Sequence, residues 1–217
     1  MNSIYEHFAE LGVIPVIKVD DPDQAEPLAK ALCEGGLPAA EVTFRTDSAA
    51  ETIARMVKAC PDMLVGAGTV LNRDQVDAAI AAGAQFIVSP GLNPDTVSWC
   101  IEKGVPILPG TCTPGDIERA ISLGLDVVKF FPAEASGGIN MIKALAAPYN
   151  KMKFMPTGGV KPSNLKDYLE QDCILACGGT WMVPDSALQA GDFDKIRWLT
   201  EEAADIVKDI KKTKYVK

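Results

Sequence analysis

One lysine lies in the middle of the apolar stretch Asp126-Val127-Val128-Lys129-Phe130-Phe131-Pro132-Ala133, which has the composition of a buried strand. Burial disfavours the charged form of an amine, and the neutral amine is the form that attacks a carbonyl carbon. A lysine at a strand end, with its ammonium group in solvent, would have no such role. This stretch alone does not separate the two interpretations, so the rest of the chain must decide.

Short β-branched runs alternate with amphipathic segments of helical length along the whole chain. The predicted strands are residues 13–17, 40–44, 64–67, 86–89, 107–110, 127–131, 153–157 and 174–178. The first intervening helix is expected to begin after Asp20-Asp21, with Pro22 at an early position, and to end at Gly35-Gly36. Strands and helices that alternate at this spacing predict a parallel sheet with helices outside it.

An open doubly wound sheet and a closed barrel both satisfy this alternation, and the polar residues favour the barrel. In residues 41–45, period two sends Glu41, Thr43 and Arg45 to one face, and Val127, Lys129 and Phe131 share a face of the sixth strand. Polar residues also end the other strands, and groups from so many strands meet only if the sheet closes. The glycine pattern of a dinucleotide-binding fold is incomplete at residues 66–69. We therefore predict an α/β fold, a single-domain (β/α)8 TIM barrel over residues 1–217, with an extra amphipathic N-terminal helix in residues 1–12.

Composition excludes several classes of function. The chain has 217 residues and a net charge of -8, which argues against nucleic-acid binding because phosphate contacts need clustered Lys and Arg. The one basic cluster, residues 208–217, is expected to be a solvated helix end. No apolar run reaches the length of a membrane span, and the N-terminus does not have the pattern of a signal peptide. Six scattered cysteines and a single histidine predict reduced thiols in a cytoplasmic protein and no metal site.

Two charged residues of the second strand are candidates for a site. Glu41 and Arg45 would be costly inside an apolar barrel unless each has a partner. A structural pair between the two is the simpler interpretation, but the other polar groups at the same end favour a site. An arginine binds a carboxylate with two parallel hydrogen bonds, and a carboxyl group beside a nucleophilic lysine can carry protons.

Paired glycines follow the last two predicted strands, in Thr157-Gly158-Gly159 and Gly178-Gly179-Thr180. Glycine lets backbone N–H groups approach an anion, and the loops after strands 7 and 8 are the usual phosphate site of such barrels. One Gly-Gly pair alone would predict only a turn. Two pairs at these positions, each beside a threonine, predict a phosphate site.

Together these stretches resemble the 2-keto-3-deoxy-6-phosphogluconate (KDPG) aldolase family, also known for 4-hydroxy-2-oxoglutarate cleavage. The matching segments are residues 14–17, 41–46, 65–70, 89–91, 129–134, 156–160 and 178–181, in order and at the spacing of the family. The resemblance implies a class I, Schiff-base aldolase of carbohydrate metabolism (the Entner-Doudoroff type). It further implies a homotrimer without a metal or other cofactor, acting on a phosphorylated 2-keto acid and releasing pyruvate.

The resemblance also implies a role for each matching residue. Lys129 would form the Schiff base and Glu41 would carry protons, while the expected substrate-binding residues are Arg45, Thr69, Pro90, Phe131, Thr157, Gly158, Gly159, Gly179 and Thr180. Many members of the family have serine where this chain has Thr180. The hydroxyl group is kept, so the added methyl bears on substrate preference and not on the type of reaction.

Three alternatives remain open from the sequence. One is an aldolase that prefers the galactonate over the gluconate substrate. A second is a phosphate-binding barrel enzyme, an isomerase or synthase, that uses Lys129 as an electrostatic group and forms no adduct with pyruvate. The third is a catalytically silent barrel that binds a phosphorylated sugar acid, against which the complete set of Glu41, Arg45 and Lys129 argues.

Overall fold

The computed structural model describes residues 3–214 and has an α/β fold in which parallel strands alternate with helices. The strands are β1 (Val13–Ile17), β2 (Ala39–Thr43), β3 (Leu64–Gly68), β4 (Ile87–Val88), β5 (Ile107–Leu108), β6 (Gly110–Thr111), β7 (Val127–Phe130), β8 (Lys153–Pro156) and β9 (Cys177–Gly179). The α-helices are α1 (Ser3–Leu11), α2 (Ala25–Glu34), α3 (Ala49–Ala59), α4 (Arg73–Ala81), α5 (Pro94–Glu102), α6 (Pro114–Ser122), α7 (Gly138–Ala146), α8 (Pro162–Leu169), α9 (Asp185–Gln189) and α10 (Phe193–Lys214). Short 3-10 turns, η1 (Pro22–Gln24) and η2 (Glu134–Ser136), precede α2 and α7.

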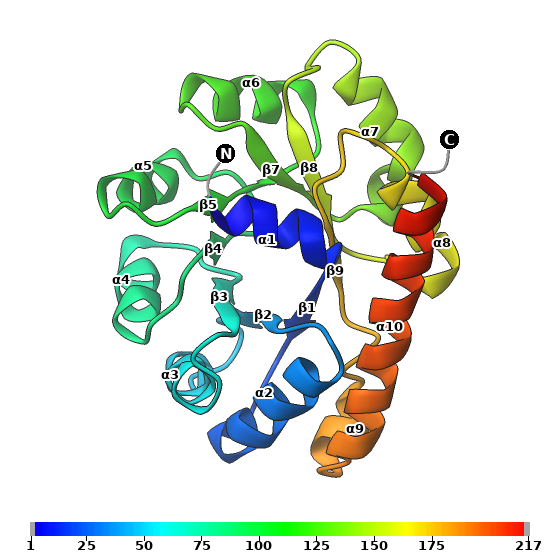
Figure 1. Ribbon diagram of the computed structural model, residues 1–217. Coiled ribbons are helices and arrows are strands. Elements are labelled where there is room, and N and C mark those ends of the chain that lie inside the picture. The colour runs from blue at the N-terminus through cyan, green and yellow to red at the C-terminus, as the bar shows by residue number, and fades with distance from the viewer. Residues whose placement is uncertain (1–2, 215–217) are drawn as a thin grey trace.

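The strands form two curled parallel sheets, in the orders β5-β4-β3-β2-β1-β9 and β6-β7-β8. Isolated parallel bridges, Phe154 to Ile174 and Thr157 to Gly178, connect β8 with the segment that contains β9. At the other edge, β5 and β6 are successive pieces of one run of chain. The strands thus curl around a common interior, and the helices lie outside them (Figure 1).

The prediction of eight barrel strands is therefore only partly correct, because the described residues give nine strands in sheets of six and three. The predicted fifth strand is divided at Pro109, which has no N–H group for the ladder. The predicted eighth strand, residues 174–178, contributes only its last two residues to β9. Its first residues contact β8 through the bridge at Ile174.

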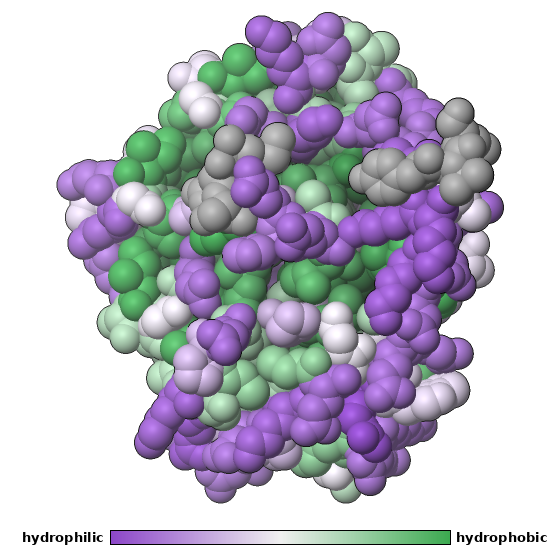
Figure 2. Space-filling view, in the orientation of Figure 1, coloured by the Kyte–Doolittle hydropathy of each residue, from purple (hydrophilic) through white to green (hydrophobic). Residues whose placement is uncertain are grey.

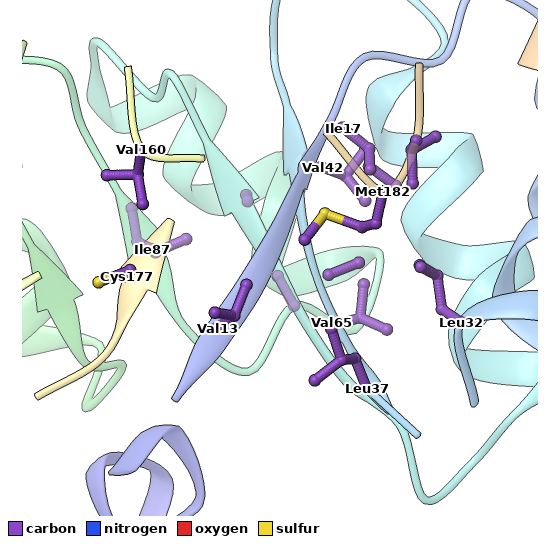
Figure 3. Packing of buried hydrophobic residues seen from close by; sticks show 14 of the residues in the cluster. Val13, Ile17, Leu32, Leu37, Val42, Val65, Ile87, Val160, Cys177 and Met182 are labelled. Atoms are coloured by element: carbon purple, nitrogen blue, oxygen red, sulfur yellow. The ribbon is translucent and has the colours of Figure 1, made fainter. Parts of the chain in front are cut away.

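Two apolar layers lie on the two sides of the strands. The outer layer packs strands against helices, and in Figure 3 Leu32 of α2 faces Val42 and Val65 of β2 and β3. The inner layer combines α1 with side chains from both sheets: Tyr5, Phe8, Ile14, Ala39, Leu64, Phe86, Val88, Leu108, Val127, Met155, Leu175 and Ala176. This division confirms the predicted alternation, since Val42 is in the outer layer and Val127 in the inner one.

Helix α1 closes one end of the interior. Figure 1 shows it lying across the ring of strands, at the end where the strands begin. The ring of Phe8 is fully buried and meets Phe86 edge-on, with centroids 4.9 Å apart and an interplanar angle of 88°. The predicted N-terminal helix is confirmed for residues 3–11, while residues 1 and 2 lie outside the described part. Water is thereby kept from the inner layer at this end.

The basic cluster at the end of α10 is a solvated helix end only in part. Lys208 and Lys212 pair with aspartates one turn earlier on the same helix, and Figure 2 shows the hydrophilic outer face of α10. Lys211 and Lys214 instead bind other elements, because Lys211 donates to the Ala9 carbonyl at 2.7 Å and Lys214 pairs with Asp172 at 2.9 Å. The predicted cluster extends to residue 217, and its last three residues lie outside the described part.

All six cysteines are free thiols, and burial raises the pKa of Cys177. Residues 3–214 contain no group of three or more His, Cys, Asp or Glu side chains placed to hold a metal ion. None of the helices in this range is both long and apolar enough to cross a bilayer.

Replacement of Phe8 tests whether α1 is part of the core. We expect Phe8→Ala to lower the free energy of unfolding by about 3–5 kcal/mol, because it leaves a cavity against Phe86. Urea denaturation followed by circular dichroism measures the change. Trp198→Ala is the control, since that side chain is 56% exposed, and we expect a change of about 0.5 kcal/mol or less. Equal losses in the two variants would show that α1 is not a core element.

Candidate active site

A cavity of about 280 Å³ opens where the strands end. Its lining comes from strands of both sheets and from the loops that follow them: Val16, Glu41, Thr43, Arg45, Thr69, Pro90, Lys129, Phe131, Thr157, Gly158, Gly159, Val160, Gly178 and Thr180. The apolar inner layer and α1 lie at the other end of the strands. The cavity therefore has a closed apolar floor and an open polar mouth.

A buried ion pair lies at the bottom of this cavity. The Lys129 Nζ and Glu41 Oε1 atoms are 3.3 Å apart, and their side chains are 7% and 1% exposed. The lysine is on β7 and the glutamate on β2, which belong to different sheets. Nζ also lies 5.1 Å from the centroid of the Phe131 ring. The pair thus bridges the interior between strands that are not neighbours.

Two glycines of β3 leave space for side chains in the interior. A Cβ atom on Gly68 would lie 2.3 Å from Glu41 Oε1, and one on Gly66 would lie 2.4 Å from the ring of Phe86. Real atoms do not come this close, so any larger residue at either position would displace Glu41 or Phe86. The incomplete nucleotide-binding pattern at residues 66–69 therefore has a packing role. It leaves space for a carboxylate in the upper layer and for an aromatic ring in the lower one.

Several polar atoms at the site have no partner within the protein. Glu41 Oε2 and Thr157 Oγ1 are buried and accept or donate no hydrogen bond within the described residues. Buried polar atoms are normally satisfied, so two such atoms beside one cavity indicate groups that a bound molecule would satisfy. Thr69 has φ 56° and is the single non-glycine residue with positive φ in residues 3–214. Strain of this kind in a threonine is uncommon and clusters at functional sites.

Arg45 lies at the mouth of the cavity and is exposed. Its Nε donates to Thr43 Oγ1 at 3.1 Å, and no carboxylate of residues 3–214 pairs with its guanidinium group. Because Glu41 pairs with Lys129, the interpretation of Glu41 and Arg45 as a structural pair is wrong. The guanidinium group is free to bind an anion.

The loop after β8 is shaped to receive an anion. Gly158 and Gly159 have φ 99° and 83°, a conformation open to glycine. The Gly159 N–H has no acceptor in residues 3–214, and the carbonyls of Gly158 and Gly159 accept from the Glu134 N–H at 3.0 Å and from Asn164 Nδ2 at 3.1 Å. These two bonds hold the loop with the Gly159 N–H available to an anion.

The side chain of Glu134 packs against the same glycine loop. Its Cγ lies 2.6 Å from where a Cβ on Gly159 would be, and its carboxylate accepts a hydrogen bond from the hydroxyl of Tyr168. Burial, together with this carboxylate, raises the pKa of Tyr168. The phenol therefore stays protonated and remains a donor.

The structure brings together ten of the eleven predicted site residues around this cavity, and Gly179 is the exception. The inward position on β9 is Gly178, where a Cβ would lie 2.4 Å from Thr157 Oγ1, whereas a Cβ on Gly179 would meet the ring of Trp181 at 2.1 Å. Sequence reasoning missed four lining residues, Val16, Thr43, Val160 and Gly178. Of these, Thr43 had a signal, since period two placed it on the face of Glu41.

The arrangement suits imine chemistry. A buried amine, once neutral, can attack a carbonyl carbon, and the carboxylate 3.3 Å away can take or return the proton. The guanidinium group of Arg45 and the glycine loop line the same cavity as the lysine, and groups of these kinds can bind anions. Such a cavity would hold an anionic carbonyl compound with its reactive carbon at Nζ.

Comparisons with known proteins agree with this chemistry. The family described as KDPG and KHG aldolase matches residues 4–199. A 2-dehydro-3-deoxy-phosphogluconate aldolase of Treponema pallidum is 49% identical over 207 residues, covering 95% of this chain and 99% of the relative. The KDPG aldolase structure of Zymomonas mobilis ZM4 with 3-phosphoglycerate has a TM-score of 0.89 and 41% identity, covering 94% and 96% of the two chains.

A further structure shows a covalent adduct. The KDPG aldolase of Legionella pneumophila, with pyruvate captured at low pH as a covalent carbinolamine intermediate, has a TM-score of 0.89 and 36% identity to this chain. The similarity covers 92% of this chain and 97% of that one. A carbinolamine is the first product of an amine and a ketone, so this relative performs the chemistry inferred from the geometry.

Substitution of each partner of the ion pair, and of both, tests its burial. We expect Lys129→Met and Glu41→Met each to lower the free energy of unfolding by about 3 kcal/mol, because each leaves a charge without its partner. The double variant should lie closer to the parent than either single variant, since no buried charge remains. Chemical denaturation gives the free energy of unfolding of the parent, the two single variants and the double variant.

Lys166→Met is the matched control, because Lys166 on α8 pairs with Glu170, the residue after the helix, in a solvent-exposed position, and we expect no measurable change. Losses that add in the double Lys129 and Glu41 variant would contradict a buried coupled pair.

Proposed function

The chain belongs to the KDPG and KHG aldolase family, and from this premise we propose that it is a class I aldolase cleaving KDPG to pyruvate and glyceraldehyde 3-phosphate. The observation that carries the proposal is the buried Lys129 amine 3.3 Å from the Glu41 carboxylate, at the bottom of a cavity that Arg45 and the glycine loop also line. The same chemistry cleaves 4-hydroxy-2-oxoglutarate to pyruvate and glyoxylate. The enzyme is an aldehyde-lyase.

The reaction begins at Lys129. Its Nζ attacks the C2 carbonyl carbon of the keto acid to form a carbinolamine, which loses water to give a protonated imine. The water leaves with the former carbonyl oxygen, and Glu41 is close enough to supply the proton that this step requires. The positive nitrogen next to C3 then acts as an electron sink for the bond to be broken.

Glu41 carries the proton in the cleavage step. Its carboxylate takes the proton of the C4 hydroxyl as the C3–C4 electron pair moves toward the imine, which releases the aldehyde and leaves an enamine. Oε2 is the atom for this task, because Oε1 faces Nζ while Oε2 has no partner in the described residues. Glu41 then returns the proton to C3, and hydrolysis of the imine releases pyruvate and regenerates the amine.

The remaining residues bind the two ends of the substrate. Arg45 holds the carboxylate, and Thr69 and Pro90 lie beside that end. Phe131 provides an apolar wall next to the amine. The aldehyde chain and its phosphate lie at the glycine loop after β8, where the Gly159 N–H is free, toward the side chain of Thr180. The residues of this end are Thr157, Gly158, Gly159, Gly179 and Thr180, and Gly179 acts by letting Trp181 pack beside it.

Further proposals concern the architecture. Residues 1–217 form a single aldolase domain, and its two sheets act as one closed (β/α)8 barrel in which β5 and β6 make one strand. The inner layer supports this, because its side chains come from both sheets. The domain assembles as a cytoplasmic homotrimer. Leu71 and Ile101, which are 53% and 50% exposed, are apolar surface of the kind that an interface covers.

Reductive trapping with pyruvate tests the proposed function. Borohydride reduces an imine to a stable amine, so we expect a mass increase after incubation with both reagents, mapped by peptide mass spectrometry to Lys129. Lys129→Arg, which keeps the positive charge but loses the nucleophile, should show none. A folded parent chain without an adduct would refute the aldolase assignment and favour a phosphate-binding barrel enzyme without a Schiff base. Glyceraldehyde 3-phosphate and glyoxylate, offered with pyruvate in the reverse direction, identify the aldehyde.

A change at Glu41 tests its proton-carrying role. We expect Glu41→Gln to lower kcat by about 10²–10⁴-fold, because the amide cannot accept the C4 hydroxyl proton. Steady-state kinetics of KDPG cleavage gives the value, and Glu102→Gln on α5, an exposed position, is the control. Full turnover in Glu41→Gln would remove Glu41 from this role.

A further inference from the structure

Arg45 is an exposed arginine that the protein holds by one polar contact. Its Nε donates to Thr43 Oγ1 at 3.1 Å, and no other hydrogen bond or ion pair of residues 3–214 involves its side chain. An exposed arginine has several rotatable bonds and samples many orientations unless something fixes it. The contact with Thr43 is therefore the one that selects an orientation of the guanidinium group.

The Thr43 hydroxyl can act only as an acceptor toward Arg45. This side chain is buried, at 2% exposure, and its single proton is donated to the Ile17 carbonyl at 3.0 Å. The oxygen lone pairs are thus directed to Arg45 Nε. Thr43 lines the cavity, but with its proton committed it offers no donor to a bound carboxylate. Any effect on a carboxylate must pass through Arg45.

The backbone around Arg45 is fixed separately. Thr46 Oγ1 and Ser48 Oγ donate to the Val19 carbonyl at 2.9 and 2.6 Å, and the Phe44 N–H donates to the Gly68 carbonyl at 2.7 Å. These bonds hold the loop between the ends of β1 and β3. They leave the long side chain free, so loop anchoring and side-chain orientation depend on different groups.

We propose that Thr43 is a positioning residue for the keto-acid carboxylate: it occupies Arg45 Nε and so directs the edge formed by the two Nη groups into the cavity. The guanidinium group has five N–H donors, and the four on Nη1 and Nη2 remain available for a carboxylate. Without the Thr43 oxygen, the side chain can rotate toward solvent. The inference rests on the proposed function and adds a residue that acts on substrate affinity without donating a hydrogen bond to the substrate.

The test compares Thr43→Val, which keeps the shape but loses the hydroxyl, with the parent. We expect Thr43→Val to raise KM for KDPG about tenfold, the effect of one hydrogen bond to a charged group, while kcat stays within about threefold. Thr43→Ser, which keeps the hydroxyl, should recover most of the affinity. Thr52→Val is the matched control, because Thr52 is a fully buried threonine on α3 whose hydroxyl has no partner in the described residues.

A double-mutant cycle separates positioning from general structure. In an Arg45→Ala background, Thr43→Val should change KM by less than about twofold, because the group it orients is gone. An effect of the same size in both backgrounds, or none in the parent, would overturn the inference. If Thr43→Val does not fold, Thr43→Ala completes the same cycle.

Reductive trapping with pyruvate separates a failure of the proposed function from a failure of the role proposed for Thr43. A parent chain that forms no adduct with pyruvate and borohydride refutes the proposed function itself. A parent that forms the adduct, with an unchanged KM in Thr43→Val, refutes only the role of Thr43.

Discussion

The buried pair of Lys129 and Glu41 is the interaction on which the rest of the structure depends. Its partners come from β7 and β2, which lie in different sheets, so they meet only because the sheets curl around one interior. Removing two charges from water costs more than their attraction returns unless the geometry is good and the surroundings are polar. The curl of the sheets, the glycines of β3 and the open mouth of the cavity supply these conditions.

The interior is divided into an apolar layer and a polar layer. Below the pair, α1 and side chains from both sheets form a dry cluster, with Phe8 against Phe86. In the polar layer, which contains the pair itself, Gly68 and Gly178 leave the space that Glu41 and Thr157 occupy. Small residues on inward positions of one strand thus match large polar ones on its neighbour. The apolar layer closes the floor, so a ligand reaches Nζ from the mouth of the cavity.

Much of this was predictable from the sequence, because period two assigns a face to each residue of a strand. Alternation placed Glu41, Thr43 and Arg45 together and separated Val127 and Lys129 from Val128, and the structure agrees. Details that depend on neighbouring strands were not predictable. Gly178, and not Gly179, faces the cavity because of the register of β9 against β1, in which Gly179 pairs with Pro15. A register shift of one residue would exchange the two faces. The partner of Glu41 is likewise a matter of three-dimensional distance, since 88 positions separate it from Lys129.

The unsatisfied polar groups of the site favour one orientation of a bound ligand. A fold normally pairs its buried polar atoms, yet this one leaves Glu41 Oε2 and Thr157 Oγ1 unpaired beside one cavity and holds Thr69 at φ 56°. These features are unfavourable in the free protein, and a ligand that satisfies them offsets their cost only when it is bound. Arg45 lies on the β2 side of Lys129 and the glycine loop on the β8 side. Under the proposed function, a substrate with a carboxylate at one end and a phosphate at the other would therefore fit in one orientation, with its carbonyl carbon at Nζ and its C4 hydroxyl at the free oxygen of Glu41.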